Sequence, residues 1–227
     1  MREATKGGHM QGEKEKYNQR NRTNKIYNLD IVSPYMNTND FWEMPIISKD
    51  NYIPERLIGF NEAMTSTDND AGVHFFLDDY QFERIWKEPR RYADALKKFG
   101  GVCSPDFSLY LDMPIPLQIY NTYRSRLIGQ YFQSQGLKVI PTISWANKDS
   151  FEFCFKGIPK GSVVAISTLG VRKDKEALSI WQNGKKELIA QIEPSILLIY
   201  GGKVETDESK VKILWYENQI IKRMKGK

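Results

Sequence analysis

The sequence contains few of the residues on which many enzymes and metal proteins depend. Among 227 residues there are two cysteines and two histidines. Cys103 and Cys154 lack the CxxC spacing of a zinc or redox site, so we expect reduced thiols in an apolar core. His9 lies in a tag-like start, MREATKGGHM, and His74 lies in an apolar run, where a buried neutral imidazole is expected. Zinc sites and nucleophilic systems that need a histidine are therefore not expected.

Long hydrophobic runs are also missing. Two of the longest, Ile196–Tyr200 and Val163–Ile166, have the length of buried strands, far below the about 20 residues that a membrane span requires. The first residues have no apolar segment typical of a secretory signal. We therefore expect a cytoplasmic protein that does not bind membranes, with its oligomeric state left open.

Positive charge is concentrated at the two ends of the chain. Residues 1–25 carry seven basic and three acidic residues, and residues 203–227 carry seven and four. Of the net charge of +5, this leaves −2 for residues 26–202. Basic ends can bind the phosphates of nucleic acid, and they are also typical of poorly ordered termini. We predict a basic disordered arm over residues 1–25, part of it a tag, and a basic tail over 217–227.

Residues 26–72 and 73–216 show different patterns. In the first stretch, Ser33, Met44 and Ile53 each precede a proline, which disfavours helices. The stretch is nevertheless too apolar for a free linker. We predict an ordered irregular segment that wraps the rest of the protein, with a short helix over residues 54–64.

From residue 73, short apolar runs alternate with longer amphipathic stretches. The runs are at 73–77, 101–103 (continuing towards 107), 138–143, 162–167 and 195–200, with a further edge strand at 211–216. The expected helices cover 80–99 (broken at Pro89), 115–135, 149–155 and 174–192. This alternation predicts an α/β domain of five or six mostly parallel strands with helices on the faces. A complete barrel needs about 250 residues, so we expect an incomplete barrel or an open doubly wound sheet.

Polar or small residues follow each of the five predicted strands from 73–77 to 195–200. Ligands of parallel α/β folds bind at the carboxyl ends of the strands, so these residues are candidates for a site. Asp78, Asp79 and Asp106 can act as acid–base catalysts, or as ligands of Mg²⁺, which is a candidate cofactor. The same residue types are common as helix caps and in tight turns, and that alternative stays open.

Five small residues are expected to shape a ligand pocket: Ser108, Ser144, Ser167, Thr168 and Gly170. The last three can offer hydroxyl and N–H groups to a phosphate at a helix N-terminus, although neither GxxxxGK[ST] nor GxGxxG occurs. Trp145 either stacks on a base or sugar or forms the rim of the core.

The helix expected over 115–135 carries two arginines on different faces. Arg124 falls within the stripe that faces the core, and Arg126 falls outside it. A buried arginine needs an anionic partner, because an unpaired buried charge is costly. We expect that partner to be one of the strand-end aspartates or an anionic ligand.

Several segments carry a resemblance to a known family. They are HFFLDDYQFE (74–83), GVCSPDFS (101–108) with DMP (112–114), VIP (139–141) leading to Trp145, and IPKGSVVAISTLG (158–170). Together they resemble a family known as a domain of unknown function in Gram-positive bacteria, their phages and conjugative elements. The resemblance covers roughly residues 40–202. It implies a phage or mobile-element origin and brings no established activity or catalytic residues.

These observations predict a protein that binds a small phosphate-bearing or nucleotide-like ligand at the strand carboxyl ends. Whether it also hydrolyses the ligand or transfers a group from it is left open. Two alternatives remain. One is a nucleic-acid-binding accessory protein of a mobile element that uses its basic ends, and the other is a non-catalytic inhibitor of a host factor.

Overall fold

The computed structural model describes residues 24–33, 35–172 and 174–217. The chain divides into two compact units, residues 1–32 and 33–227. In the first unit, the described part contains a 3-10 helix, η1 (Leu29–Ile31). Most of the predicted arm and nearly all of the predicted basic tail lie outside the described residues. The boundary between the units falls inside the segment 26–72.

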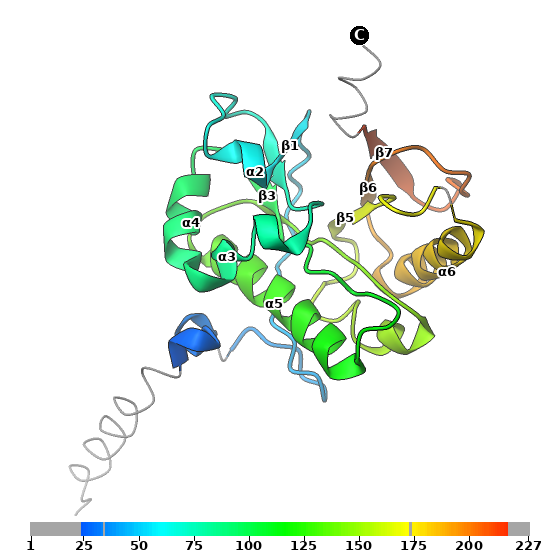
Figure 1. The fold of residues 1–227 in the computed structure, drawn as a ribbon, viewed down its shortest axis with the longest axis horizontal. Helices are drawn as coiled ribbons and strands as arrows, with labels where there is room; N and C mark the ends of the chain where they lie inside the picture. Colours follow the sequence, from blue (N-terminus) through cyan, green and yellow to red (C-terminus); the bar gives the residue numbers. More distant parts are fainter. Residues whose placement is uncertain (1–23, 34, 173, 218–227) are drawn as a thin grey trace, which may run out of the picture. The chain divides into compact units, whose positions relative to one another are not determined.

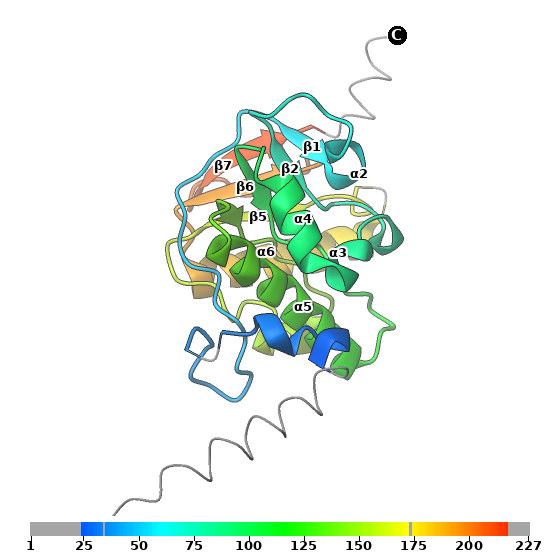
Figure 2. The same cartoon turned by 90° about the vertical axis from the view of Figure 1, so that its left-hand side faces the viewer.

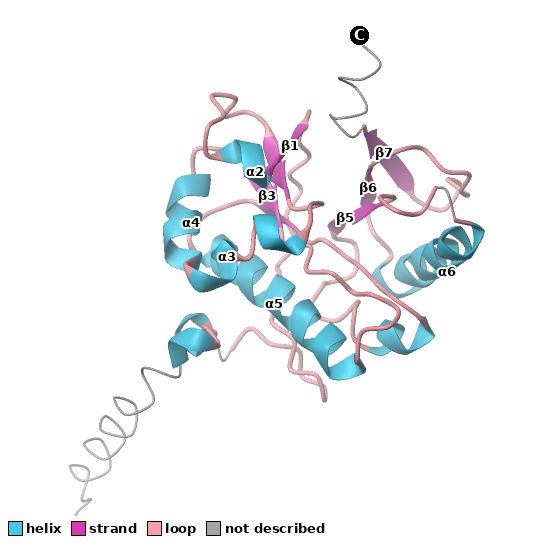
Figure 3. Ribbon diagram, in the orientation of Figure 1, coloured by secondary structure: helices cyan, strands magenta, loops and turns pink. Residues whose placement is uncertain are grey.

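The second unit is built on parallel strands (Figures 1 and 3). In chain order they are β1 (Leu57–Gly59), β2 (Gly72–His74), β3 (Gly101–Cys103), β4 (Val139–Ile140), β5 (Val163–Ser167), β6 (Ile196–Tyr200) and β7 (Lys212–Tyr216). Strands β1 to β4 form one sheet and β5 to β7 another, and every neighbouring pair is parallel. The α/β prediction is confirmed. The predicted strand number was too low, because β1 lies where we expected only a helix.

Strand order follows the order of the sequence in both sheets. A parallel bridge between Thr142 and Ala165 connects the end of β4 to β5. The rings of His74 on β2 and Tyr200 on β6 lie 4.1 Å apart, so side chains of the two sheets meet in the interior. A doubly wound sheet has a point where the strand order reverses, and this sheet pair has none. The arrangement corresponds to the predicted incomplete barrel.

Helices connect and cover the strands. They are α2 (Phe60–Ala63), α3 (Arg84–Lys87), α4 (Pro89–Leu96), α5 (Ile115–Ser134) and α6 (Lys175–Ile192), with 3-10 helices η2 (Asp79–Gln81) and η3 (Lys148–Glu152). Pro89 begins α4 at a position where its missing N–H costs no hydrogen bond, which explains the predicted break. Helix α4 flanks the four-stranded sheet, and α6 packs its Trp181 and Leu188 into the core beneath the three-stranded sheet (Figure 2). None of the helices that the structure describes is long and apolar enough to cross a membrane.

Helix α5 is covered on more than one face, which the sequence did not predict. Gln133 exchanges two hydrogen bonds of 2.8 Å with the backbone of Ser48. The amide of Gln130 donates to the carbonyl oxygen of Met36 at 2.6 Å. The segment before β1 therefore lies along a second face of α5, and residues outside the predicted core-facing stripe are buried as well.

Arg126 is the clearest example of a residue of α5 that is buried outside the predicted stripe. We expected it outside the core-facing stripe, yet it is only 2% exposed. Its guanidinium donates to three backbone carbonyl oxygens, those of Thr142 at 2.9 Å, Cys154 at 2.6 Å and Lys156 at 3.0 Å. Burial lowers the pKa of Arg126 to about 10, so the group stays charged at neutral pH. It joins α5 to the chain after β4 and to the chain after η3.

We predict that Arg126→Met lowers the free energy of unfolding by about 3 kcal/mol or more, because three buried carbonyl groups lose their donor. The measurement is urea unfolding. Arg91→Met on α4 is the matched control, since Arg91 is largely exposed and pairs with Glu88 at the surface. The control should change stability by about 1 kcal/mol or less. Equal effects of the two substitutions would contradict the role given to Arg126.

Candidate functional site

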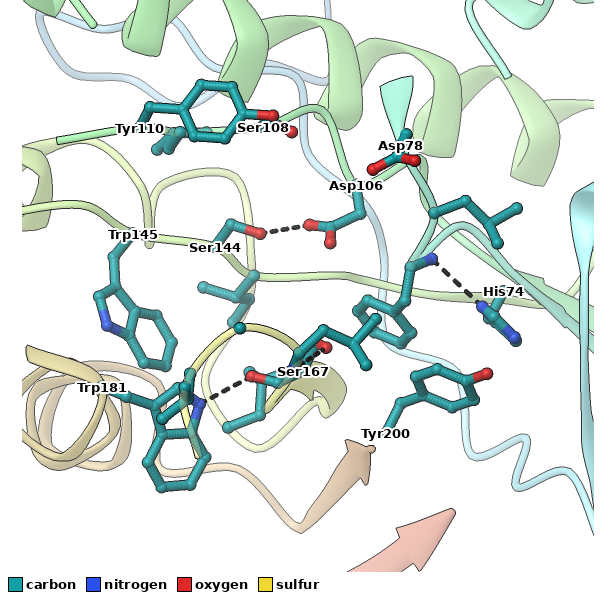
Figure 4. Close-up of a pocket in the computed structure, with 18 of the residues that line it drawn as sticks. His74, Asp78, Asp106, Ser108, Tyr110, Ser144, Trp145, Ser167, Trp181 and Tyr200 are labelled. Atoms are coloured by element: carbon teal, nitrogen blue, oxygen red, sulfur yellow. Dashed lines mark hydrogen bonds between the residues drawn. The ribbon is translucent and has the colours of Figure 1, made fainter. Parts of the chain in front are cut away.

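A cavity of about 740 Å³ opens at the carboxyl ends of the strands (Figure 4). Its lining includes residues at the ends of β1, β2, β3, β4, β5 and β6. Seven of the residues predicted from the sequence line it, namely Asp78, Asp106, Ser108, Ser144, Trp145, Ser167 and Gly170. Three others, Asp79, Arg124 and Thr168, are not among the lining residues.

Asp106 and Ser144 form the central polar pair of the cavity. Ser144 Oγ donates a hydrogen bond to Asp106 Oδ1, and the second carboxylate oxygen is directed into the cavity (Figure 4). Burial raises the pKa of Asp106 from 3.8 to about 7. The hydrogen bond from Ser144 opposes this rise, the charge of Asp79 adds to it, and the charge of Arg126 opposes it. A carboxyl group that titrates near neutral pH can both donate and accept a proton.

Asp79 does not line the cavity but binds Ser108, which does. Its carboxylate accepts hydrogen bonds from the backbone N–H of Ser108 at 3.2 Å and from Ser108 Oγ at 2.8 Å. It therefore holds the chain after β3 in place. Asp78 is exposed and lines the cavity. Within the described ranges, no group of three or more His, Cys, Asp or Glu side chains is arranged to hold a metal ion. The three predicted aspartates thus do not form a ready-made metal centre.

Two tryptophans form one wall of the cavity. Trp145 Nε1 donates to the carbonyl oxygen of Ile180 at 3.3 Å, and Trp181 Nε1 donates to that of Ser167 at 2.8 Å. Gly184 of α6 makes room for Trp145, because a Cβ there would lie 2.1 Å from its Nε1. Trp181 was not predicted from the sequence, since an apolar residue on an amphipathic helix is indistinguishable from an ordinary core residue.

The hydroxyl groups of Ser167, at the end of β5, and of the following Thr168 form hydrogen bonds with the backbone of the protein. Ser167 Oγ accepts the N–H of Leu169 at 3.0 Å, and Thr168 Oγ1 donates to the carbonyl oxygen of Gly202 at 2.8 Å. At the start of α6, Asp174 accepts the N–H groups of Glu176 and Ala177. A carboxylate therefore occupies the helix N-terminus at which we had placed a phosphate.

Arg124 does not pair with a strand-end aspartate, and that prediction is wrong. Its Nη2 forms a salt bridge with Glu83 Oε2. Its guanidinium also lies over the ring of Phe107, 3.7 Å from the centroid. Glu83 lies between η2 and α3, one turn beyond the aspartates. The pair links the chain after β2 to α5 and fixes the surroundings of the cavity.

His74 is buried and neutral, as expected. It is 1% exposed, and its Nδ1 accepts the backbone N–H of Phe76 at 3.2 Å. Burial lowers its pKa to about 3. Cys103 and Cys154 are both buried free thiols. His74 therefore does not titrate near neutral pH.

We predict that Asp106→Asn changes how stability depends on pH. The pKa of Asp106 is raised in the folded protein, so the free energy of unfolding falls as pH rises from 3.8 towards about 7. The substitution removes this loss and keeps an acceptor for Ser144. Relative to the unsubstituted protein, the variant should gain about 2–3 kcal/mol between pH 5 and pH 8. Urea unfolding at both pH values measures this difference.

Asp94→Asn is the matched control, because Asp94 lies exposed on α4 and pairs with Lys97. Its pH profile should run parallel to that of the unsubstituted protein. A parallel profile for Asp106→Asn would show that Asp106 is not buried enough to titrate near neutral pH.

Comparison with known proteins assigns the family. The model of the family described as "Domain of unknown function (DUF4417)" matches residues 36–217. The chain is 44% identical over 163 residues to "Gene 1 protein" of Mycobacterium phage L5. The aligned residues cover 70% of this chain and 71% of the L5 protein. The chain is 39% identical over 179 residues to the protein of the same name from Mycobacterium phage D29, covering 78% and 65% respectively.

The chain thus spans somewhat less than two thirds of the D29 protein. No solved structure matches it. The family resemblance seen in the sequence is confirmed by a match that extends beyond both ends of the motifs. The chain belongs to the DUF4417 family, a domain of unknown function, and is homologous to mycobacteriophage gene 1 proteins.

Proposed function

We propose that the cavity binds a small nucleotide-like ligand and that Asp106 moves a proton to or from it. The observation that carries this proposal is the hydrogen-bonded pair of Asp106 and Ser144 in an aromatic-walled cavity at the strand carboxyl ends. Ligand sites of parallel α/β proteins lie at this edge. The cavity volume of about 740 Å³ is in the range of small-molecule sites.

The walls suit a flat ring with polar groups. Trp145, Trp181 and Tyr110 line the cavity and offer aromatic surfaces on which a base can stack. Asp78 and Asp112 line it as well, and carboxylates accept hydrogen bonds from the hydroxyl groups of a ribose. Both tryptophans are fixed by hydrogen bonds to the backbone, which favours a preformed site.

Asp106 gives the site its chemistry. Protonated, it can donate to a leaving group; ionised, it can take a proton from water or from a ligand hydroxyl. Ser144 orients the carboxyl group through its hydrogen bond. Hydrolysis or group transfer on the bound ligand is the reaction class that such a residue supports. Asp79 acts through Ser108 as a positioning residue.

The alternative of nucleic-acid binding through the basic ends depends mainly on residues 1–23 and 218–227, which lie outside the described residues. It predicts binding that falls steeply with salt and disappears when both ends are removed. Binding of a small ligand in the cavity should survive both changes.

The proposal predicts that a nucleoside or nucleotide raises the melting temperature of the protein. The panel contains nucleosides, nucleoside phosphates and sugar phosphates, each with and without Mg²⁺. A ligand at 100 times its dissociation constant should add about 2.7 kcal/mol of stability. Release of base or phosphate is then followed for each ligand that binds.

Asp106→Asn should leave binding within about threefold and lower turnover by about 100-fold or more, as expected for loss of an acid–base group. Asp94→Asn should change neither quantity. If no nucleoside, nucleotide or sugar phosphate stabilises the protein, the proposed function is wrong.

A further inference from the structure

Among the described residues that line the cavity, every ionisable side chain apart from the neutral His74 and the tyrosines is acidic. The carboxyl groups are those of Glu62, Asp78, Asp106 and Asp112. No lysine or arginine is among the described residues that line the cavity. Arg124 and Arg126 lie nearby in the fold, but they are held by Glu83 and by backbone carbonyl groups. A phosphate placed inside would meet several carboxylates and no cation, which is electrostatically unfavourable.

The charged side chains give the hydrogen-bonding capacity of the cavity the same bias, while the amides of Asn61 and Gln81, which also line it, can both donate and accept. Ionised carboxylates only accept hydrogen bonds, and they therefore favour ligand groups that donate. The hydroxyl of Ser144 already donates to Asp106, and Ser167 Oγ already accepts the N–H of Leu169. An exocyclic amino group fits these surroundings better than a carbonyl oxygen.

The described cation nearest in sequence to this part of the lining is Arg172. Arg172 follows Val171, which lines the cavity, and it is exposed. Its side chain lies across Gly202 after β6, since a Cβ on that glycine would be 2.4 Å from Arg172 Nη1. The absence of a side chain at position 202 leaves the space that the guanidinium fills. The described residues that line the cavity are thus acidic, and an exposed arginine follows them directly in the chain.

We infer that the ligand enters with an amino-bearing heteroaromatic ring inside the cavity and carries any phosphate outside, beside Arg172. This inference rests on the proposed function and names the part of the ligand that is recognised. The ring stacks between the aromatic walls, and its amino group donates to the carboxylates. The phosphate adds little to affinity, because it meets one solvent-exposed arginine.

The first experiment compares probes that differ at one edge of the base. Adenosine is compared with inosine, and cytidine with uridine, by calorimetry on the full chain. Each pair replaces an amino group by a carbonyl oxygen and converts the neighbouring ring nitrogen from an acceptor into an N–H donor. The amino-bearing member of at least one pair should bind about tenfold more tightly, the effect of one good hydrogen bond. The 5′-monophosphate of that nucleoside should bind within about tenfold of the nucleoside itself.

The second experiment tests the rim. Arg172→Glu should weaken binding of the monophosphate by about fivefold and leave binding of the nucleoside unchanged, because an exposed ion pair contributes little. Lys186→Glu is the matched control. It makes the same charge change at an exposed position of α6 beyond the cavity-lining residues, and it should affect neither ligand.

The outcomes separate the inference from the proposed function. If nucleotides bind and the matching nucleosides bind more than 100-fold more weakly, about 2.7 kcal/mol, the phosphate occupies the cavity; the inference fails and the proposed function stands. Preference for inosine and uridine over their amino counterparts also overturns the inference. If none of these probes binds, the inference is wrong, and the proposed function is decided by the wider panel of nucleosides, nucleoside phosphates and sugar phosphates.

Discussion

The rest of the structure depends on the hydrogen bonds that the buried guanidinium of Arg126 donates to three backbone carbonyl oxygens. A positive charge in the core is tolerated only where oxygen atoms surround it. Here the oxygens are backbone carbonyls of the segments after β4 and after η3. The arginine supplies the hydrogen-bond donors for these three carbonyl oxygens. It thereby allows irregular chain to be buried beneath the cavity.

The same charge reaches the site through a short network. Arg126 donates to Thr142 O and lies 3.4 Å from Ser125 Oγ, and Ser125 and Ser104 share a hydrogen bond of 3.1 Å. Ser104 Oγ in turn accepts the N–H of Thr142 at 2.9 Å. Asp106 lies two residues beyond Ser104, and the positive charge counteracts part of the rise in its pKa. Arg126 therefore takes part in the packing of the core and also opposes the rise that burial causes in the pKa of Asp106.

The sequence was informative where local pattern decides the outcome. Parallel strands and a polar carboxyl edge follow from the alternation of apolar runs and helices, and most of the predicted edge residues line the cavity. The sequence was uninformative where contacts between distant segments determine which residues are buried and which residues pair. Nothing local shows that the segment before β1 covers α5, so the burial of Arg126 was not predictable. The partner of Arg124 was misjudged for the same reason, because Glu83 comes close only after η2 turns the chain.

Gly184 shows that this protein gives up stability for the shape of its cavity. A glycine in the interior of a helix such as α6 costs about 1 kcal/mol relative to alanine. Even alanine would collide with Trp145, so the better helix former is excluded by a side chain that serves the cavity. The helix therefore carries a permanent local weakness at its centre. Improvement of thermal stability by mutation has to avoid this position, since a side chain there would displace Trp145 from the wall of the cavity.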